Sequence, residues 1–303
     1  MNRPPFPEVV DSSIMAAARS CGRKVQIEYL EHWKGKDPSV HLHAGGAYAK
    51  GMEVARTEFF LNGRSAEDSV ALGVGALLKF YGDFQCPPDS SKSAERTAGA
   101  LEFYFSRYPL GEDKAIPIDL PGGKKGIEFG FVEPLPEVTH PETGNPMLYC
   151  GRMDMICNYN GMILGEDDKT ASQLGASWPR QWDLRSQFTG YVWGAKKAGG
   201  VSLGGFLVRG VSILKTKYDT LEAITYRPDW QIDRWYEQLI RDIRKLKAQW
   251  EEGYFDYNLD HACTEYGGCP FRQICLTRDP QPMLEQLFVR RKWDPVTRTE
   301  TLL

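Results

Sequence analysis

Two neighbouring stretches of the chain decide its fold: residues 148–157, LYCGRMDMIC, and residues 161–170, GMILGEDDKT. We expect the first stretch to form a β-strand and the second to form its partner. The connection from Asn158 to Gly161 contains an Asn-Gly pair, which is a strong signal for a tight turn between strands. Together the two stretches predict a β-hairpin.

Two acidic residues and a lysine lie on this hairpin. Asp154 belongs to the first strand, and Asp167 and Lys169 lie near the end of the second. Residues two apart in a strand point to the same face of a sheet, so Asp167 and Lys169 project together while Asp168 points away. A hairpin can bring Asp154 alongside them. Two carboxylates at one point form a hard-oxygen site suited to Mg²⁺ or Mn²⁺, to which the backbone carbonyl of Asp168 could add another oxygen.

This arrangement suits the hydrolysis of phosphodiester bonds. A bound metal ion neutralises phosphate oxygens and helps to generate hydroxide from water. Lys169 would orient the attacking water or stabilise the charge that develops on the phosphorane. The alternative is a surface hairpin with ordinary charges, because the D-x-K spacing is common by itself. The apolar strand before Asp167 favours the metal site, since consecutive acidic residues at its end are costly unless they are solvated or bind a cation.

The helix predicted after the hairpin, over residues 183–198, carries a second pair. Gln187 and Tyr191 are four residues apart, so they share one face of a helix. By itself this spacing fits the surface of any amphipathic helix. Its place directly after the hairpin favours a pair that acts together with the carboxylates and the lysine.

Taken together, GRMDMI, LGEDDKT and the Gln187-x-x-x-Tyr191 pair resemble the RecB-like branch of the PD-(D/E)XK nucleases. In that branch an Asp on one strand, a D/E-x-K on the next strand and a Q-x-x-x-Y on the following helix form the active site. The resemblance implies a catalytic set of Asp154, Asp167, Lys169, Gln187 and Tyr191, with both aspartates as ligands of Mg²⁺ or Mn²⁺. It also implies that the glutamine and the tyrosine orient the lysine or contact the DNA strand.

One position departs from this pattern. Many RecB-like members carry a metal-binding His on an early helix, in a setting like G-x-x-x-H, and the matching stretch here is residues 45–53, GGAYAKGME. Ala49 takes the position of that His. Glu53, one turn later, or Glu128 could supply a carboxylate instead. The number of metal ions at the site therefore stays open.

Cysteines form the second signal. The chain has seven, an odd number, and no export signal, which argues against a disulfide framework and favours metal ligation by clustered cysteines. Cys263, Cys269 and Cys275 lie within thirteen residues, in a segment broken by glycines and a proline, and can fold around one metal centre. A tetrahedral or cuboidal centre needs a fourth ligand, for which Cys21 is the best candidate.

RecB-like nucleases that carry an iron-sulfur cluster have this layout, with one cysteine before the nuclease core and three after it. The resemblance, which extends to CRISPR-associated adaptation nucleases, AddB-like proteins and phage-type members, implies a [4Fe-4S] cluster held by Cys21, Cys263, Cys269 and Cys275. The first gap here spans five residues, where the CRISPR-associated and AddB types usually have two, although phage relatives share a segment like Y-G-G-C-P-F-R (residues 266–272). Structural Zn²⁺ is the alternative, because iron and zinc both accept four thiolates.

Other thiol and aromatic side chains are open to structural explanations. Three cysteines lie on or near apolar stretches, where cysteine behaves as a small hydrophobe: Cys86, Cys150 and Cys157. Three tryptophans near the predicted helix at 183–198 could stack on unpaired bases or pack in the core: Trp178, Trp182 and Trp193.

Composition sets wider limits. The chain has 303 residues, of which 42% are hydrophobic and 25% are charged, as in ordinary globular proteins. The formal net charge of -3 neither indicates nor excludes nucleic-acid binding, which needs only a local positive surface. We find no apolar run long enough to span a bilayer, and MNRPPFPEVVDSS at the N-terminus lacks the apolar core of a signal peptide. We therefore expect a cytoplasmic protein that has no membrane partner.

Predicted helices and strands give a mixed α/β pattern. Their order is three helical stretches, the hairpin, a helix, two strands and a helix: 12–34, 46–62, 66–108 with interruptions, 148–170, 183–198, 203–215, 220–227 and 229–252. We expect a single nuclease domain over residues 1–303, divided into a helical part (12–110), a catalytic core (111–252) and a cysteine-rich part (253–290). The resemblance implies a restriction-endonuclease-like core, which is a mixed central sheet flanked by helices, with helical and cysteine-rich elaborations.

The expected activity is that of a Mg²⁺- or Mn²⁺-dependent deoxyribonuclease, either an exonuclease or a DNA-end-processing enzyme. Its partners would be single-stranded DNA or duplex ends, and a recombination or replication protein. The main alternative is a weakly active or inactive DNA-binding subunit that keeps the nuclease fold, and the missing His motivates it. A third hypothesis is an iron-sulfur or zinc protein that acts in regulation or redox chemistry.

Overall fold

The computed structural model describes residues 3–36, 39–264 and 268–303. The chain divides into two compact units, each made of more than one segment. We call Pro38–Phe129 with Arg152–Ile232 the central unit, and Met1–Asp37 with Gly130–Gly151 and Asp233–Leu303 the terminal unit. The expectation of one nuclease domain over residues 1–303 stays a prediction. Tyr266 and Gly267 of the cysteine-rich motif lie outside the described residues.

A mixed sheet runs through the central unit. Its strands are β3 (Ala115–Pro117), β6 (Met162–Ala171), β7 (Gly205–Ile213), β8 (Tyr218–Tyr226) and the second part of β5 (Pro146–Tyr159). β5 runs antiparallel to β6, β6 runs parallel to β7, and β7 runs antiparallel to β8. The connection between the parallel strands contains helix α6 (Ser186–Gly199), as parallel pairing requires a crossover.

The hairpin of β5 and β6 forms where the sequence predicted it. The two strands pair antiparallel, with Met155 opposite Glu166. Asn160 and Gly161 turn the chain with φ of 51° and 87°, the left-handed conformation that Asn-Gly adopts in two-residue loops. The side chain of Asn158 accepts a hydrogen bond from the backbone N of Gly161 at 2.8 Å and so fixes the turn.

The longer helices of the central unit are α3 (Val40–Phe60), α4 (Ala66–Tyr81), α5 (Ala94–Arg107) and α6. Ser65 caps α4 and Ser93 caps α5 through their hydroxyl oxygens, which accept hydrogen bonds from backbone N–H groups of the first turn. A Cβ at Gly73 of α4 would lie 2.7 Å from the carbonyl oxygen of Gly51 of α3. Glycine at this position therefore allows the two helix backbones to touch.

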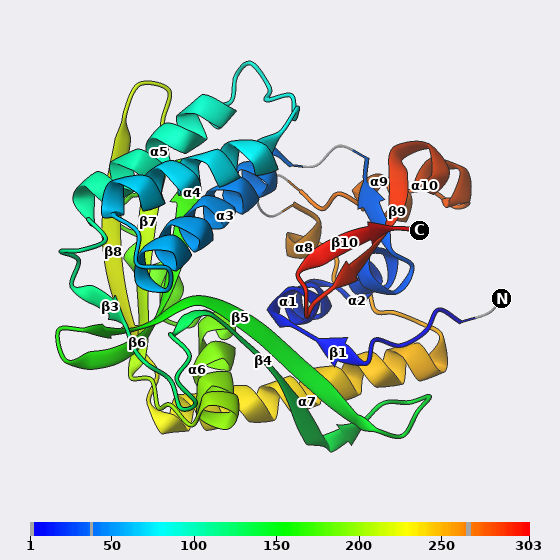
Figure 1. Ribbon diagram of the computed structural model, residues 1–303. Helices are drawn as coiled ribbons and strands as arrows, with labels where there is room; N and C mark the ends of the chain where they lie inside the picture. The colour runs from blue at the N-terminus through cyan, green and yellow to red at the C-terminus, as the bar shows by residue number, and fades with distance from the viewer. Residues whose placement is uncertain (1–2, 37–38, 265–267) are drawn as a thin grey trace. The chain divides into compact units, whose positions relative to one another are not determined.

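Helices cover both faces of the central sheet. On one face, α3, α4 and α5 share a core with β7 that includes Leu77, Leu101 and Val211 (Figure 1). On the other face, Phe188 of α6 stacks on Phe206 of β7 with ring centroids 4.6 Å apart. Phe206 and Val211 are an odd number of residues apart, so their side chains point to opposite faces. The expected α/β architecture, a mixed central sheet flanked by helices, is confirmed.

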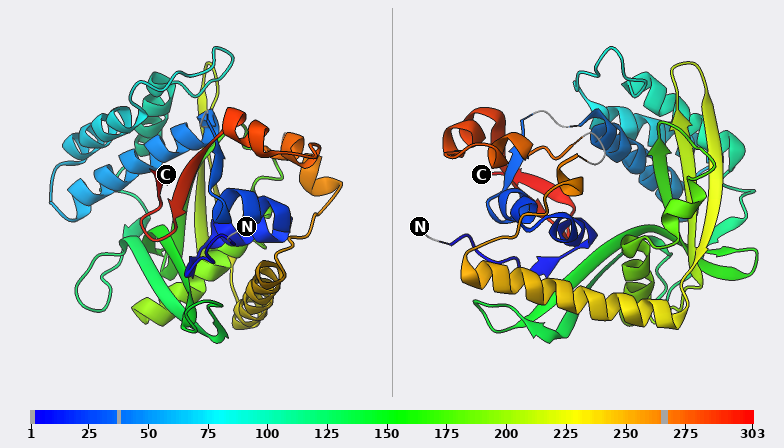
Figure 2. Two further views of the ribbon diagram at one scale, coloured as in Figure 1. Left: turned by 90° about the vertical axis from the view of Figure 1, so that its right-hand side faces the viewer. Right: turned by 180° about the vertical axis from the view of Figure 1, so that it is seen from behind.

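The terminal unit combines the two ends of the chain. Its helical elements are α1 (Ser12–Ser20), α2 (Gly22–Val25), a π-helical turn (Gln26–Leu30), α8 (His261–Thr264), α9 (Arg272–Cys275), α10 (Gln281–Leu287) and most of α7 (Asp229–Glu252). Its strands are β1 (Val9–Val10), β2 (Trp33–Gly35), β9 (Phe288–Asp294), β10 (Thr299–Leu302), most of β4 (Ile127–Thr139) and the first part of β5. β9 pairs antiparallel with β10 and with β2 (Figure 2).

The terminal unit departs from the sequence prediction in two places. The helix expected over 12–34 breaks at Cys21, where the backbone is extended with φ -165° and ψ 126°, and the segment ends as strand β2. Strands β9 and β10 were not predicted. A small core accounts for the strands, because Ile27 and Trp33 pack with Phe271 and Phe288. At the break, the backbone N of Arg23 donates to the carbonyl oxygen of Asp256 at 3.0 Å. Tertiary packing of the two chain ends therefore overrides the local helical pattern.

No helix in the described part of the chain combines the length and the apolar character needed to cross a membrane.

Candidate functional site

The predicted carboxylates and the lysine meet on β5 and β6. The backbone N of Asp168 donates a hydrogen bond to Oδ2 of Asp154 at 2.9 Å, which holds the Asp154 carboxylate against β6. The Lys169 ammonium forms an ion pair with the Asp167 carboxylate. The hairpin thus brings Asp154 to the strand that carries Asp167 and Lys169.

Successive side chains of β6 point to opposite faces of the sheet. Asp167 and Lys169 contact each other on one face. Glu166 and Asp168 lie on the other face, where they bind the guanidinium of Arg56 from α3 at 2.6 Å and 2.7 Å. The Asp168 side chain therefore points away from Lys169, as the strand spacing predicted. Only the backbone of Asp168 contacts the Asp154 carboxylate.

Burial shapes the electrostatics of this strand. Asp167 is 3% exposed, and burial raises its pKa to about 6, with the charge of Asp154 adding to the rise and Lys169 opposing it. Burial also raises the pKa of Asp168 to about 7, against the lowering effect of Arg56. A buried carboxylate beside a second carboxylate is unfavourable when ionised, so a bound cation would stabilise the pair.

The Gln187 and Tyr191 pair lies on α6. Nε2 of Gln187 donates a hydrogen bond to the hydroxyl of Tyr191 at 2.9 Å, so the two side chains form one unit. The ring of Tyr191 lies 5.9 Å from the ring of Phe206. Phe206 is in register with Gly165 of β6, which shares a face with Asp167. The structure therefore brings the pair to the face of the sheet that carries the catalytic candidates.

The three positions considered for a further metal ligand have other surroundings. Ala49 is exposed on α3. The Glu53 carboxylate pairs with Lys50 at 2.8 Å. The Glu128 carboxylate pairs with Arg152 at 3.0 Å. Both glutamates thus already have a cationic partner.

The sequence analysis did not identify Arg152 as a site residue. It precedes Asp154 by two residues in β5, so both side chains point to the same face of the strand. Its side chain is 35% exposed. A cation on the face of the carboxylates can contact a phosphate. The R-x-D spacing within GRMDMI was the available signal for it.

The sequence analysis also did not predict a buried network of ion pairs behind β6. Arg209 of β7, 1% exposed, binds Asp113 through two hydrogen bonds of 2.5 Å and 2.7 Å and lies 3.5 Å from Glu166. The Tyr104 hydroxyl donates to Glu166 at 3.2 Å. Together with Arg56, these residues anchor the rear of the strand. An arginine inside the otherwise apolar stretch GFLVRGVSI was the available signal, since buried charges need partners.

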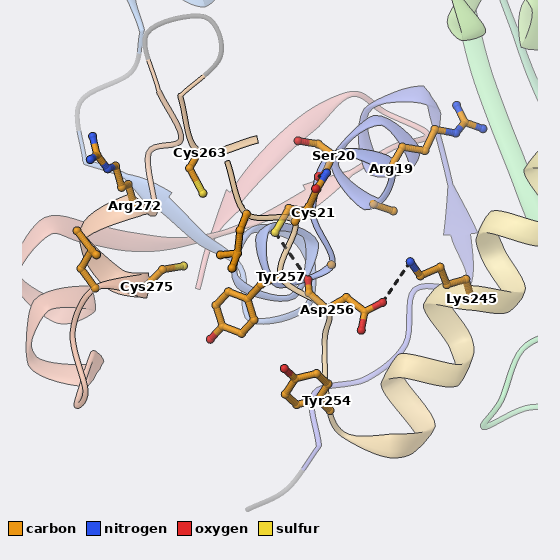
Figure 3. A pocket seen from close by; sticks show the side chains of 15 residues that line it. Arg19, Ser20, Cys21, Lys245, Tyr254, Asp256, Tyr257, Cys263, Arg272 and Cys275 are labelled. Atoms are coloured by element: carbon orange, nitrogen blue, oxygen red, sulfur yellow. Dashed lines mark hydrogen bonds and ion pairs between the residues drawn. The ribbon is translucent and has the colours of Figure 1, made fainter. Parts of the chain in front are cut away.

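The four cysteines singled out from the sequence gather in the terminal unit. Cys21, Cys263, Cys269 and Cys275 all line one small cavity of about 30 Å³. Figure 3 shows the thiols of Cys21, Cys263 and Cys275 directed toward a common space. The backbone N of Cys269 donates to the carbonyl oxygen of Cys263 at 3.1 Å. Residues more than 200 positions apart in the sequence thus converge on one cavity.

Charges around this cavity partly balance one another. Burial raises the pKa of the Cys269 thiol, with Lys24 opposing the rise and the neighbouring cysteines adding to it. Burial likewise raises the pKa of Cys275, where Arg23 acts in the opposite direction. Basic side chains beside thiols favour the thiolate form that binds metals. Within residues 3–36, 39–264 and 268–303, no three His, Cys, Asp or Glu side chains are grouped closely enough to hold a metal ion.

Most of the remaining candidates are buried. Cys150 and Cys157 are buried, and burial raises the pKa of Cys150 to about 12. Cys86 is partly exposed in the loop between α4 and α5. The three tryptophans considered for base stacking are each 7% exposed, which leaves them as core residues: Trp178, Trp182 and Trp193.

Comparisons with known proteins give no family. No family model matches the chain, and no curated protein matches it. Eighteen chains of solved structures match. One is a candidate exonuclease from Eubacterium rectale, with 14% identity, a TM-score of 0.49, and coverage of 89% of this chain and 93% of that chain. Another is the protein SSO0001, with 13% identity, a TM-score of 0.30, and coverage of 76% of this chain and 83% of that chain.

Proposed function

We propose that the chain is a metal-dependent nuclease of the RecB-like PD-(D/E)XK type, which hydrolyses phosphodiester bonds in DNA and acts as an exonuclease or on DNA ends. One observation carries the proposal. Asp154, held against β6 by a backbone hydrogen bond, lies beside the strand that presents Asp167 and Lys169 together. The other acidic side chains of this strand, Glu166 and Asp168, form ion pairs with Arg56 on the opposite face. The acidic side chains of β6 therefore lie on two faces of the sheet. Those on one face pair with Arg56, and Asp167 on the other face is available to a ligand.

The donor set fits Mg²⁺ or Mn²⁺. Asp154 and Asp167 would hold the ion, and the backbone carbonyl of Asp168 would add an oxygen. The buried Asp167 carboxylate, whose pKa is raised to about 6, is a group that a divalent cation would stabilise in its ionised form. When bound, the ion supplies Lewis-acid stabilisation of the phosphate and lowers the pKa of water.

Lys169 is the catalytic cation of the proposal. Its side chain is 31% exposed and forms an ion pair with Asp167, so its ammonium lies at the carboxylates and in reach of solvent. There it orients the attacking water or stabilises negative charge on the phosphate oxygens. Gln187, fixed by its hydrogen bond to Tyr191, orients the lysine or contacts the DNA strand.

We further propose that Cys21, Cys263, Cys269 and Cys275 hold a [4Fe-4S] cluster with a structural role. Their convergence on one cavity and the basic residues Arg23 and Lys24 near them support this assignment. Among the described residues the thiols do not lie close enough together to hold a metal ion as they stand, so a bound cluster would draw them inward. Structural Zn²⁺ is the alternative ligand. Protein purified without oxygen and analysed for iron, acid-labile sulfide and zinc tests the assignment. Stoichiometric zinc in a colourless protein would overturn the cluster.

Nucleotide release from end-labelled DNA tests the nuclease. In Mn²⁺, Asp167→Asn and Lys169→Ala are each expected to lower the rate by about 10²–10³-fold, because the first removes a charged ligand of the metal ion and the second removes a cation that stabilises charge in the transition state. Asp219→Asn on β8, an exposed carboxylate, is the matched control and should keep full activity. Full activity in both site variants would sink the proposal.

A second function has an observation in its favour. Ala49 cannot ligate a metal, and the Asp167 carboxylate is occupied by Lys169, so a weakly active or inactive DNA-binding subunit is the alternative. Tight binding of single-stranded or duplex DNA without nucleotide release in Mg²⁺ or Mn²⁺ would favour this alternative over the nuclease.

A further inference from the structure

A large cavity in the terminal unit lies outside the proposed catalytic machinery. Its volume is about 950 Å³, near the upper end of the range of ligand pockets. Three of the four clustered cysteines line part of it: Cys21, Cys263 and Cys275. The rest of its wall comes from α1, α2, α7, the segment 254–259, and α9 with its C-cap Leu276, none of which carries a residue of the carboxylate site.

The segment 254–259, which lines this cavity, makes specific contacts with neighbouring elements. A Cβ at Gly22 would lie 2.3 Å from Oε1 of Gln249 and 2.9 Å from the carbonyl oxygen of Asp256, so glycine allows the chain to approach α2 closely. Gln249 and Asp256 exchange two hydrogen bonds of 3.0 Å and 3.2 Å. Nδ2 of Asn258 donates to the carbonyl oxygen of Ser20 at 2.6 Å. The wall is therefore built by specific contacts with the N-terminal helices.

Two tyrosines of this wall expose their rings. Tyr254 is 61% exposed and Tyr257 is 45% exposed, and both line the cavity (Figure 3). Trp178, Trp182 and Trp193 of the central unit are each 7% exposed and present no free ring to a base. Exposed aromatic rings that project from a fixed wall provide the sequence-tolerant stacking surfaces on which unpaired bases bind.

Cations outnumber carboxylates around the cavity. Arg19, Lys245 and Arg272 line it, against the single carboxylate of Asp256. Lys245 pairs with Asp256 at 3.1 Å, with side chains 68% and 51% exposed, and Arg19 pairs with Asp242 at 2.6 Å. The exposed ion pair of Lys245 contributes little net stability, so a phosphate can replace its carboxylate partner at low cost.

We propose that this cavity binds a single-stranded segment of nucleic acid. Unpaired bases stack on Tyr254 and Tyr257, and the backbone phosphates contact Arg19, Lys245 and Arg272. The interior of a duplex does not fit this arrangement, because each base there is stacked on its neighbours on both faces. The inference rests on the proposed function for the choice of nucleic acid as ligand, but binding here needs neither the catalytic residues nor a divalent metal.

Fluorescence anisotropy with a labelled oligothymidylate in EDTA tests the stacking residues. The full chain, purified without oxygen, carries Asp167→Asn so that no cleavage occurs. Tyr254→Ala combined with Tyr257→Ala is expected to raise Kd by about 5-fold to 100-fold per lost base contact. Tyr254→Phe combined with Tyr257→Phe should keep the parent Kd, because the rings remain. Tyr226→Ala on β8, a tyrosine 60% exposed, is the matched control and should also bind as the parent does.

A second pair of variants tests the cations. Arg272→Glu should weaken binding and lower the dependence of log Kd on log salt by about 0.7 for a lost phosphate contact. Arg107→Glu, an exposed arginine of α5 in the central unit, changes the net charge equally and should leave both quantities unchanged. Equal weakening by both variants would mean a general charge effect and would overturn the assigned site.

Three outcomes overturn the proposal. The first is an unchanged Kd in the double Ala variant, when thermal melting shows it to be folded. The second is equal affinity for a duplex of the same length. The third is binding of polyglutamate that is lost with the same tyrosines, which would make the cavity a site for acidic peptides. Nucleotide release without tyrosine-dependent binding contradicts this inference alone, whereas tyrosine-dependent binding without release contradicts only the nuclease.

Discussion

The carboxylate site of the central unit and the cysteine cavity of the terminal unit differ in how far apart their residues lie in the sequence. Asp154, Asp167 and Lys169 lie within sixteen residues on one hairpin, so strand spacing alone orients them. Cys21 joins cysteines that follow it by more than 200 residues. The geometry of the local site depends on the residues that pack behind its strand. The geometry of the long-range site depends on contacts that hold the two chain ends together.

Cys21→Ser tests the long-range site and has the largest expected effect on stability. If four thiolates hold a cluster, loss of one releases iron and costs about 5 kcal/mol or more of unfolding free energy, because metal binding contributes to folding. Cys86→Ser, in the loop between α4 and α5, is the matched control. Iron content and thermal melting measure the effect. Equal iron and equal melting temperature in the two variants would contradict a cluster at Cys21.

Arg56→Met tests the support behind the local site. The substitution removes the guanidinium that pairs with Asp168 and Glu166, of which only Glu166 keeps a second one, Arg209 at 3.5 Å. A broken buried pair costs about 3–5 kcal/mol of unfolding free energy. Arg56→Lys should lie between the parent and Arg56→Met, because an ammonium cannot bridge both carboxylates as a guanidinium does. Urea unfolding measures these values.

Arg64→Met is the control for this experiment. Its guanidinium pairs with Glu58 at 2.7 Å, but its side chain is 55% exposed, so the expected loss is below about 1 kcal/mol. If Arg56→Met proved as mild as Arg64→Met, the buried network would not be the support of β6.

The third test uses the pH dependence of the unfolding free energy, where we expect a smaller effect from the carboxylate site. Burial raises the pKa of Asp167 to about 6 and that of Asp168 to about 7, above their unfolded value near 3.8. The folded chain therefore holds these protons more tightly, and their contribution to stability is lost as pH rises through about 6 to 7. Divalent metal should restore stability at pH 8, by about 2.7 kcal/mol at a hundredfold excess over Kd, and much less at pH 5.

Thermal melting with and without Mn²⁺ at the two pH values measures this effect. Asp167→Asn removes a charged ligand and should lose most of the stabilisation by Mn²⁺ at pH 8. An equal shift of the melting temperature by Mn²⁺ at both pH values would show that the ion binds elsewhere.

Local patterns explain why parts of the fold could be predicted from the sequence. The Asn160-Gly161 turn, the strand alternation around Asp168 and the helix over 229–252 all depend on neighbours in the sequence, and the structure contains each of them. The extended backbone at Cys21 lies between residues that bind a distant segment, since Arg23 and Ser20 form hydrogen bonds with Asp256 and Asn258. No periodicity in the sequence encodes such contacts.

The candidate sites divide in the same way. The pairing of Asp167 with Lys169 follows from spacing, whereas the ion pairs of Arg56 with β6 join residues about 110 positions apart. The sequence around Arg56 does not predict its partners on β6, because the contact forms only when α3 packs on the sheet. The four cysteines could be grouped only through a resemblance to a family, because spacing alone does not connect Cys21 to the C-terminal three.

The core that joins Ile27 and Trp33 to Phe271 and Phe288 has a consequence during synthesis. The first two residues leave the ribosome long before the last two exist. At typical elongation rates of about 5–20 residues per second, the N-terminal helices wait roughly 10–50 s for their partners. During that interval their apolar side chains are open to chaperones, while the segments of the central unit are already being made. Nascent chains stalled before residue 271 should therefore be far more sensitive to proteolysis at the N-terminal segment than released chains.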